Sequence, residues 1–171
     1  MISLVPFEPD HFEALLSWFP SDRDLVQWAG PTLRFPLDSD QLSEMLRAGQ
    51  TEPPSRLCWS ALAGREIVGH AQLGLDHRNG NGIVSRIAVA PSQRGKGIAF
   101  PMLQQVVRRA FALPRIERLE LNVYAFNTPA IRTYERVGFV KEGNRRSSAR
   151  VDGERWDTIM MGLLRSEWTG G

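Results

Sequence analysis

The stretch Gly82–Ala110 reads GIVSRIAVAPSQRGKGIAFPMLQQVVRRA, and the rest of the chain is organised around it. The segment Ile83–Val89 reads as a β-strand, and helical apolar spacing predicts an amphipathic helix over Gly97–Leu113. Between them lies Arg94–Ala99, with two glycines and two cations. The first N–H groups of a helix have no partners inside the helix and attract anions. The sequence therefore predicts a seat for a pyrophosphate group.

Two prolines help to place the helices. Pro101 lies inside the predicted central helix, where a proline is tolerated only if its missing N–H had no helical partner. A start at about Gly97 keeps Pro101 near the first turn. Further on, Thr128 and Pro129 are typical of an N-cap followed by a first helical residue, which predicts a helix over Pro129–Val137.

Alternation and turn residues predict the remaining elements, and their order indicates a mixed α/β (α+β) fold. The central helix is expected to connect two parallel strands, because such a connection needs a crossover of this length. Short helices are expected between the first two strands. Besides the strand within the opening stretch, strands are expected at Ile2–Phe7, Leu57–Ala63, Glu66–Leu75, Arg118–Tyr124, Phe139–Glu142 and Trp156–Leu164.

Composition narrows the function classes. The 171 residues suffice for one core, so a single domain is expected. The net charge of +2 favours no particular partner, although the isoelectric point of about 9.1 mildly favours anionic ligands. No dense basic face of the kind that binds nucleic acid is evident. A signal peptide and an apolar membrane span are not evident either, so a cytoplasmic protein is expected.

Cysteine and histidine usage argues against a metal site. One cysteine, Cys58, excludes an internal disulfide framework and a zinc cluster of thiolates. It lies in a predicted strand, so we expect a small buried hydrophobe and not a nucleophile. The three histidines lack the spacing of metal ligands, and no metal is expected.

Three motifs, in this order, resemble the GCN5-related N-acetyltransferases, a superfamily that uses acetyl-CoA. Arg94–Ala99 fits the pyrophosphate loop of that family, and Ile87-Ala88-Val89 lies on the strand that holds the pantetheine arm. Asn127–Phe139 fits the signature Asn-x-x-Ala-x-x-x-Tyr-x-x-x-Gly-Phe. The resemblance covers Leu57–Leu164. The flanking segments are similar to the branch that contains the ribosomal-protein and polyamine acetyltransferases.

The resemblance implies a mostly antiparallel central sheet of six to seven strands with flanking helices. The two central parallel strands would splay in a V shape, with a β-bulge on the first. Residues 1–171 would form one domain, in which about 1–50 supply an N-terminal strand and acceptor-side helices and 57–164 the acetyl-CoA-binding core. The oligomeric state stays open, with a homodimer as one alternative.

The resemblance also implies residue roles for acetyl transfer to a primary amine by direct attack in a ternary complex. Tyr134 would be the general acid that protonates the CoA thiolate, or else a core tyrosine beside Phe139. Asn127 would bind the cofactor arm, or else cap a helix. The residues implied to bind acetyl-CoA are Ile87, Ala88, Val89, Arg94, Gly95, Lys96, Gly97, Ile98, Ala99, Asn127, Ala130 and Tyr134.

The general base and the acceptor stay open at this point. Some relatives carry a glutamate where this sequence has Asn122. Glu120, two residues earlier on the same strand face, could act through water, with Asp76, His77 and Asp157 as rivals. The acceptor is a small-molecule or peptide amine: a protein N-terminus, a polyamine or an antibiotic. A catalytically silent acyl-CoA-binding module is the alternative from another class. Three tryptophans either line the acceptor cleft or pack in the core: Trp18, Trp28 and Trp59.

Overall fold

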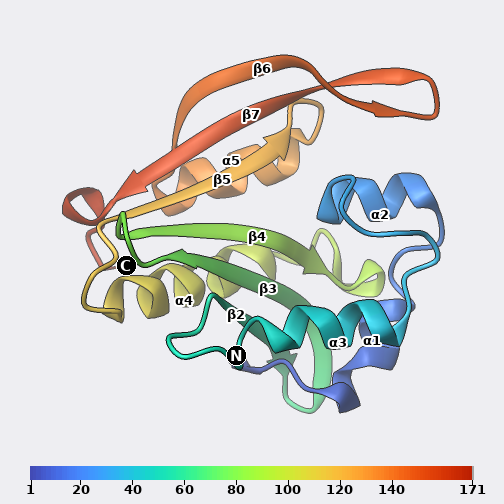
Figure 1. Ribbon diagram of the computed structural model, residues 1–171, viewed down its shortest axis with the longest axis horizontal. Helices are drawn as coiled ribbons and strands as arrows, with labels where there is room; N and C mark the ends of the chain where they lie inside the picture. The colour runs from blue at the N-terminus through green and yellow to red at the C-terminus, as the bar shows by residue number, and fades with distance from the viewer. Residues whose placement is uncertain (171) are drawn as a thin grey trace.

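The computed structural model describes residues 1–170, and within them a seven-stranded sheet carries helices on both faces (Figure 1). The strand order is β1-β2-β3-β4-β5-β7-β6, and only the β4–β5 pair is parallel. The predicted mixed, mostly antiparallel sheet is confirmed. The strands are β1 Ile2–Pro6, β2 Arg56–Ala63, β3 Glu66–Asp76, β4 Asn81–Val89, β5 Arg118–Tyr124, β6 Val140–Val151 and β7 Glu154–Leu164.

Two hydrophobic cores lie on the two faces of this sheet. The larger packs α4 and α5 against one face, and the predicted apolar stripe of α4, from Met102 to Phe111, is buried in it. The second packs α1 to α3 against the other face. No helix within residues 1–170 is both long and apolar enough to cross a membrane. The helices are α1 Phe12–Leu16, α2 Asp22–Ala29, α3 Ser39–Arg47, α4 Ala99–Ala112 and α5 Thr128–Val137, with 3₁₀ turns at Pro9–His11, Pro91–Gln93 and Arg165–Glu167.

Two helix starts differ from the predictions. Helix α4 begins at Ala99 and not at Gly97, because Gly97 has a φ of +76°, which no helical residue adopts. Pro101 is thus the third helical residue, where its missing N–H costs nothing. Helix α5 is capped by Asn127, whose side chain accepts a hydrogen bond from the N–H of Ala130. Thr128, predicted as the cap, is the first helical residue.

The strand predictions hold best where one face is buried. The β2–β3 hairpin and β5 lie within one residue of their predicted bounds. Strand β6 runs over Val140–Val151, well past the predicted end at Glu142, because it pairs with β7 as far as the turn at Asp152-Gly153. Most of its residues are exposed, so it lacks the alternation by which a strand is recognised.

The sheet opens between β4 and β5. These strands pair at only three positions, the last being Ile83 with Glu120. Beyond it β4 pairs only with β3, and β5 only with β7, so the predicted V-shaped splay is confirmed (Figure 1). The predicted bulge is also present, since Arg86 and Ile87 of β4 lie opposite the single residue Ala71 of β3. Arg86 has a φ of +49° there.

Candidate active site

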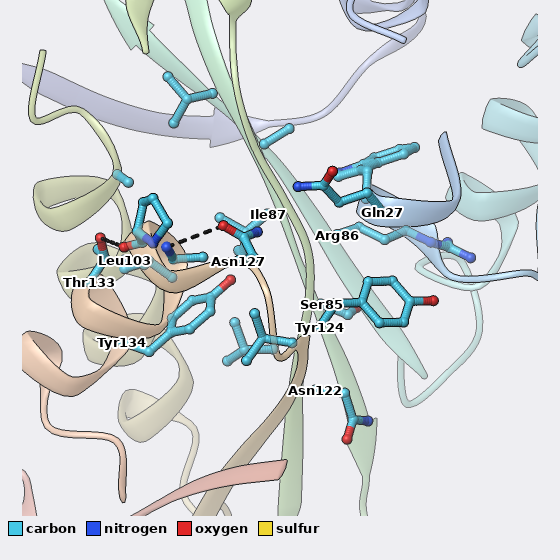
Figure 2. Close-up of a pocket in the computed structure, with 18 of the residues that line it drawn as sticks. Gln27, Ser85, Arg86, Ile87, Leu103, Asn122, Tyr124, Asn127, Thr133 and Tyr134 are labelled. Carbon is cyan, nitrogen blue, oxygen red and sulfur yellow. Dashed lines mark hydrogen bonds between the residues drawn. The ribbon is translucent and has the colours of Figure 1, made fainter. Parts of the chain in front are cut away.

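A cleft of about 1210 Å³ lies in the opening between β4 and β5. The α4 loop and α5 line one part of it, and α2, β2 and β6 line another. Figure 2 shows Tyr134 and Asn127 on one side of β4, and Gln27, Arg86 and Tyr124 on the other. A pocket for one small ligand has a volume of about 300–1,000 Å³. The cleft is therefore large enough for two ligands that meet at β4.

The loop before α4 presents backbone donors to the cleft. Gly95 and Gly97 both have a φ of +76°, a conformation that favours glycine. Among residues 1–170, no acceptor pairs with the N–H groups of Gly95, Gly97 or Ile98. These donors lie at the N-terminus of the 14-residue helix α4, whose dipole adds partial positive charge. This arrangement fits a pyrophosphate group.

The edge of β4 that faces β5 is open past Ile83. The N–H of Ala90 donates to the carbonyl of Val68 at 2.9 Å, so Ala90 pairs towards β3. Successive residues of a strand direct their backbone groups to opposite edges. The backbone groups of Val89 therefore face the cleft, where its carbonyl accepts from Nε of Arg94 at 3.3 Å. An open strand edge of this kind can pair with an extended ligand.

Tyr134 extends from α5 into the middle of the cleft. Its side chain is buried, with its ring edge-on to Phe139 at a centroid distance of 6.2 Å. Figure 2 shows the hydroxyl directed toward β4 and Asn127. Burial raises the pKa of Tyr134 to about 12, so the phenol stays protonated at neutral pH and can donate a proton. Tyr134 thus packs in the core and also reaches the cleft.

Most of the residues singled out in the sequence come together here. Of the residues predicted to bind acetyl-CoA or to act in catalysis, Lys96 and Glu120 do not line the cleft. Nζ of Lys96 donates to the side chain of Gln93, and the carboxylate of Glu120 accepts from Nε of Arg118 at 3.3 Å. The lining residues among those predicted are Ile87, Ala88, Val89, Arg94, Gly95, Gly97, Ile98, Ala99, Asn127, Ala130 and Tyr134.

Carboxylates are scarce in the cleft. Asp24 is the one acidic residue that lines it, and Ser21 donates to its carboxylate. The three rival bases, Asp76, His77 and Asp157, lie outside the lining. Within residues 1–170 no three His, Cys, Asp or Glu side chains are grouped as metal ligands would be.

Of the three tryptophans, only Trp28 lines the cleft. Its ring stacks on Phe19 with a centroid distance of 4.4 Å, and its Nε1 is buried without a hydrogen-bond partner. Trp18 and Trp59 are buried in the two cores. Cys58 packs against the second core, and burial raises the pKa of its thiol to about 11, so it stays protonated. The predicted role of Cys58 as a small hydrophobe fits this position.

A polar network beneath the bulge was not foreseen. Oε1 of Gln72 accepts from Arg56 at 3.0 Å and from Arg86 at 3.1 Å. Nε2 of Gln72 lies 3.0 Å from Nε2 of His70, which makes that nitrogen of His70 the acceptor. Burial lowers the pKa of His70 to about 3, so it is neutral at pH 7. The one signal in the sequence was a charged residue, Arg86, within an otherwise apolar strand.

Comparison with known proteins places this geometry in a family. Residues 16–139 match the Acetyltransferase (GNAT) family. The SPbeta prophage-derived uncharacterized N-acetyltransferase YokL of Bacillus subtilis is 31% identical over 80% of this chain and 77% of its own. The L-amino acid N-acetyltransferase AaaT of Escherichia coli is 28% identical over 58% of this chain and 63% of its own.

The fold has a counterpart among solved structures. A crystal structure of spermidine N-acetyltransferase from Vibrio cholerae in complex with CoA and spermine matches with a TM-score of 0.83 at 21% identity, covering 97% of this chain and 96% of the other. Polyamine and ribosomal-protein acetyltransferases are also among the sequence relatives, which confirms the resemblance to that branch. The chain therefore belongs to the Acetyltransferase (GNAT) family and is an N-acetyltransferase that uses acetyl-CoA.

Proposed function

We propose that the chain transfers an acetyl group from acetyl-CoA directly to a primary amine while both are bound in the cleft between β4 and β5. The observation that carries this proposal is the cleft itself, which brings free N–H donors, an open strand edge and the Tyr134 hydroxyl together. Among residues 1–170 its lining includes no cysteine, lysine or histidine, so its serine and threonine hydroxyls have no histidine or lysine to activate them, and Cys58 lies outside and stays protonated. Direct transfer needs no covalent nucleophile.

In this proposal the loop before α4 holds the pyrophosphate. The N–H groups of Gly95, Gly97 and Ile98 donate to its oxygens, and the pantetheine arm runs along the open edge of β4. Backbone N–H groups at Ile87 and Val89 then face the thioester carbonyl, where negative charge develops during attack. Acetyl-CoA supplies the activated acetyl group.

The residues of the same cleft suggest which groups donate and accept protons during the transfer. The amine nitrogen forms a bond to the carbonyl carbon, the carbon–sulfur bond breaks, and its electron pair leaves on sulfur. Tyr134, protonated because burial raises its pKa, donates the proton that the sulfur takes. Glu120 is paired with Arg118 away from the cleft, so the proton that the amine loses passes to water, and Tyr134 regains its proton from water. We propose the amine to be neutral when it attacks.

The acceptor class, assembly and location belong to the proposal as well. Among the relatives, one is named for L-amino acids and a fold neighbour for spermidine. Either kind of small amine is a candidate acceptor for this chain. We propose that residues 1–171 act as one domain in the cytoplasm, and sedimentation velocity will distinguish a monomer from a homodimer.

The cosubstrate seat is tested with a pair of matched glycines. Gly97 and Gly64 both have positive φ, and an added Cβ meets nothing within 4 Å at either position. Only Gly97 lines the cleft. Titration calorimetry with CoA should give saturable binding to the wild type and to Gly64→Asp, and loss of binding in Gly97→Asp because a carboxylate repels the pyrophosphate. Equal binding by all three proteins would rule out this seat.

A further inference from the structure

We infer that the acceptor amine also carries a carboxylate, as an amino acid does, and that Arg86 and Arg56 bind that carboxylate. This inference rests on the proposed acetyl transfer and identifies the acceptor class. Both guanidinium groups line the cleft, and both donate to one neutral acceptor, Oε1 of Gln72. Neither forms an ion pair with any residue in 1–170.

Two guanidinium groups that donate to the same carbonyl oxygen still have N–H donors without an acceptor, and neither positive charge is balanced by it. A guanidinium has five N–H donors in a planar fork that suits a carboxylate. Arg86 uses one donor on Gln72 and a second on Oγ1 of Thr32 at 3.3 Å. Arg86 is largely removed from solvent, and Arg56 repels it. A bound carboxylate would offset one of the two charges and accept from donors that are still free.

The local backbone is also arranged around Arg86. Arginine rarely adopts a positive φ, and such strain persists only where the surroundings enforce it. At +49° on the bulge, the backbone directs the Arg86 side chain away from Tyr134, to the side of β4 where Gln27 and Tyr124 lie (Figure 2). Trp28 lines the same cleft, and within residues 1–170 its buried Nε1 has no hydrogen-bond partner.

The charges of the cleft argue against a polycationic acceptor. A polyamine needs carboxylates to pair with, and Asp24 is the one carboxylate in the lining. Like charges facing a ligand cost binding energy and so select against it. Among residues 1–170, three arginines line the acceptor side together with that single acid: Arg56, Arg86 and Arg145.

The position of Arg86 also sets the side on which the carboxylate lies. Arg86 immediately precedes Ile87, whose backbone is proposed to face the thioester carbonyl. The Arg86 side chain extends to the side of β4 opposite Tyr134, so a carboxylate that it holds belongs to the acceptor and not to the cosubstrate. The arginines have a second effect there, because nearby positive charge favours the neutral form of an amine. The attacking nitrogen is then ready without a carboxylate base.

The test compares amino acids with their amides, which differ only in the charged group. Release of free thiol from acetyl-CoA is measured with alanine, leucine and phenylalanine, with the three corresponding amides, and with putrescine. The variants are Arg86→Asn, whose side chain tolerates positive φ, Arg86→Lys, and Arg78→Asn as an exposed arginine outside the cleft. CoA titration of each variant establishes that it is folded and binds the cosubstrate.

We expect the wild type to prefer at least one acid over its amide by about 10- to 100-fold in kcat/KM, the range of a hydrogen-bonded charge pair. Arg86→Asn should abolish that preference by slowing the acid only, Arg86→Lys should keep part of it, and Arg78→Asn should keep all of it. If the amides or putrescine have the same kcat/KM as the acids, the carboxylate site is overturned, whereas the proposal of acetyl transfer is not. Failure with every amine, together with absence of CoA binding, would overturn both.

Discussion

Acid should destabilise the protein through His70, and replacing His70 with glutamine should remove that part of the loss. His70 is fully buried, and its Nδ1 has no hydrogen-bond partner. Burial, followed by the charges of Arg86 and His11, lowers its pKa from 6.5 to about 3. The unfolded chain therefore takes up a proton at this residue in a pH range where the folded protein does not.

The sign and size of the effect follow from this difference. Because the folded pKa is depressed, the stabilisation is fully present above pH 6.5 and is lost as pH falls toward 3. Each pH unit within that window costs about 1.4 kcal/mol, and the whole window costs roughly 5 kcal/mol. Between pH 7 and pH 5 the loss is about 2 kcal/mol, a large share of a typical domain stability.

Urea unfolding of wild type and His70→Gln, followed by circular dichroism at several pH values, isolates this contribution. Glutamine keeps an acceptor for Gln72 and does not titrate. The difference in unfolding free energy between the two proteins should shrink by about 2 kcal/mol from pH 7 to pH 5, since other groups titrate equally in both. Parallel stability curves would refute the buried, neutral state of His70.

Three further predictions concern the cleft. Tyr134→Phe should lower kcat by about 10²- to 10⁴-fold and leave CoA affinity nearly unchanged, and an unaltered kcat would remove Tyr134 from the proton transfer. Asn127→Ala should cost about 1 kcal/mol in urea unfolding because α5 loses its cap, whereas full stability would contradict the hydrogen bond to Ala130. As the pH rises the free amine loses its proton, so kcat/KM should rise. Because burial raises the pKa of Tyr134 to about 12, this rise should continue up to about pH 10. A fall below pH 9 that Tyr134→Phe abolishes would contradict that pKa.

The residues that line the α4 and α5 side of the cleft could be predicted because they are local in the sequence. The pyrophosphate loop, the strand before it and the Asn127–Phe139 signature each lie within a dozen or so residues. The errors were also local and small. Gly97 was expected inside α4, but its positive φ places it in the loop, and the cap of α5 lies one residue earlier than expected.

The other side of the cleft, which we propose to bind the acceptor, could not be predicted because tertiary structure assembles it. Trp28 comes from α2, Arg56 from β2 and Arg86 from β4, and no spacing in the sequence relates them. The fold also changes what the sequence suggests about Arg86, since an arginine within a strand is usually solvated, whereas Arg86 is part of the bulge and donates to Gln72. Glu120 illustrates the reverse, because its strand position was right for a base but Arg118 engages it.

The most direct test of the mechanism mixes the protein rapidly with acetyl-CoA and follows free thiol, first without an amine and then with one. Direct attack within a ternary complex predicts no thiol release above background until the amine is added, because no residue of the cleft takes up the acetyl group. Steady release, with N-acetylated product formed in equal amount, should then follow. A burst of one thiol per protein molecule before any amine is present would contradict direct transfer.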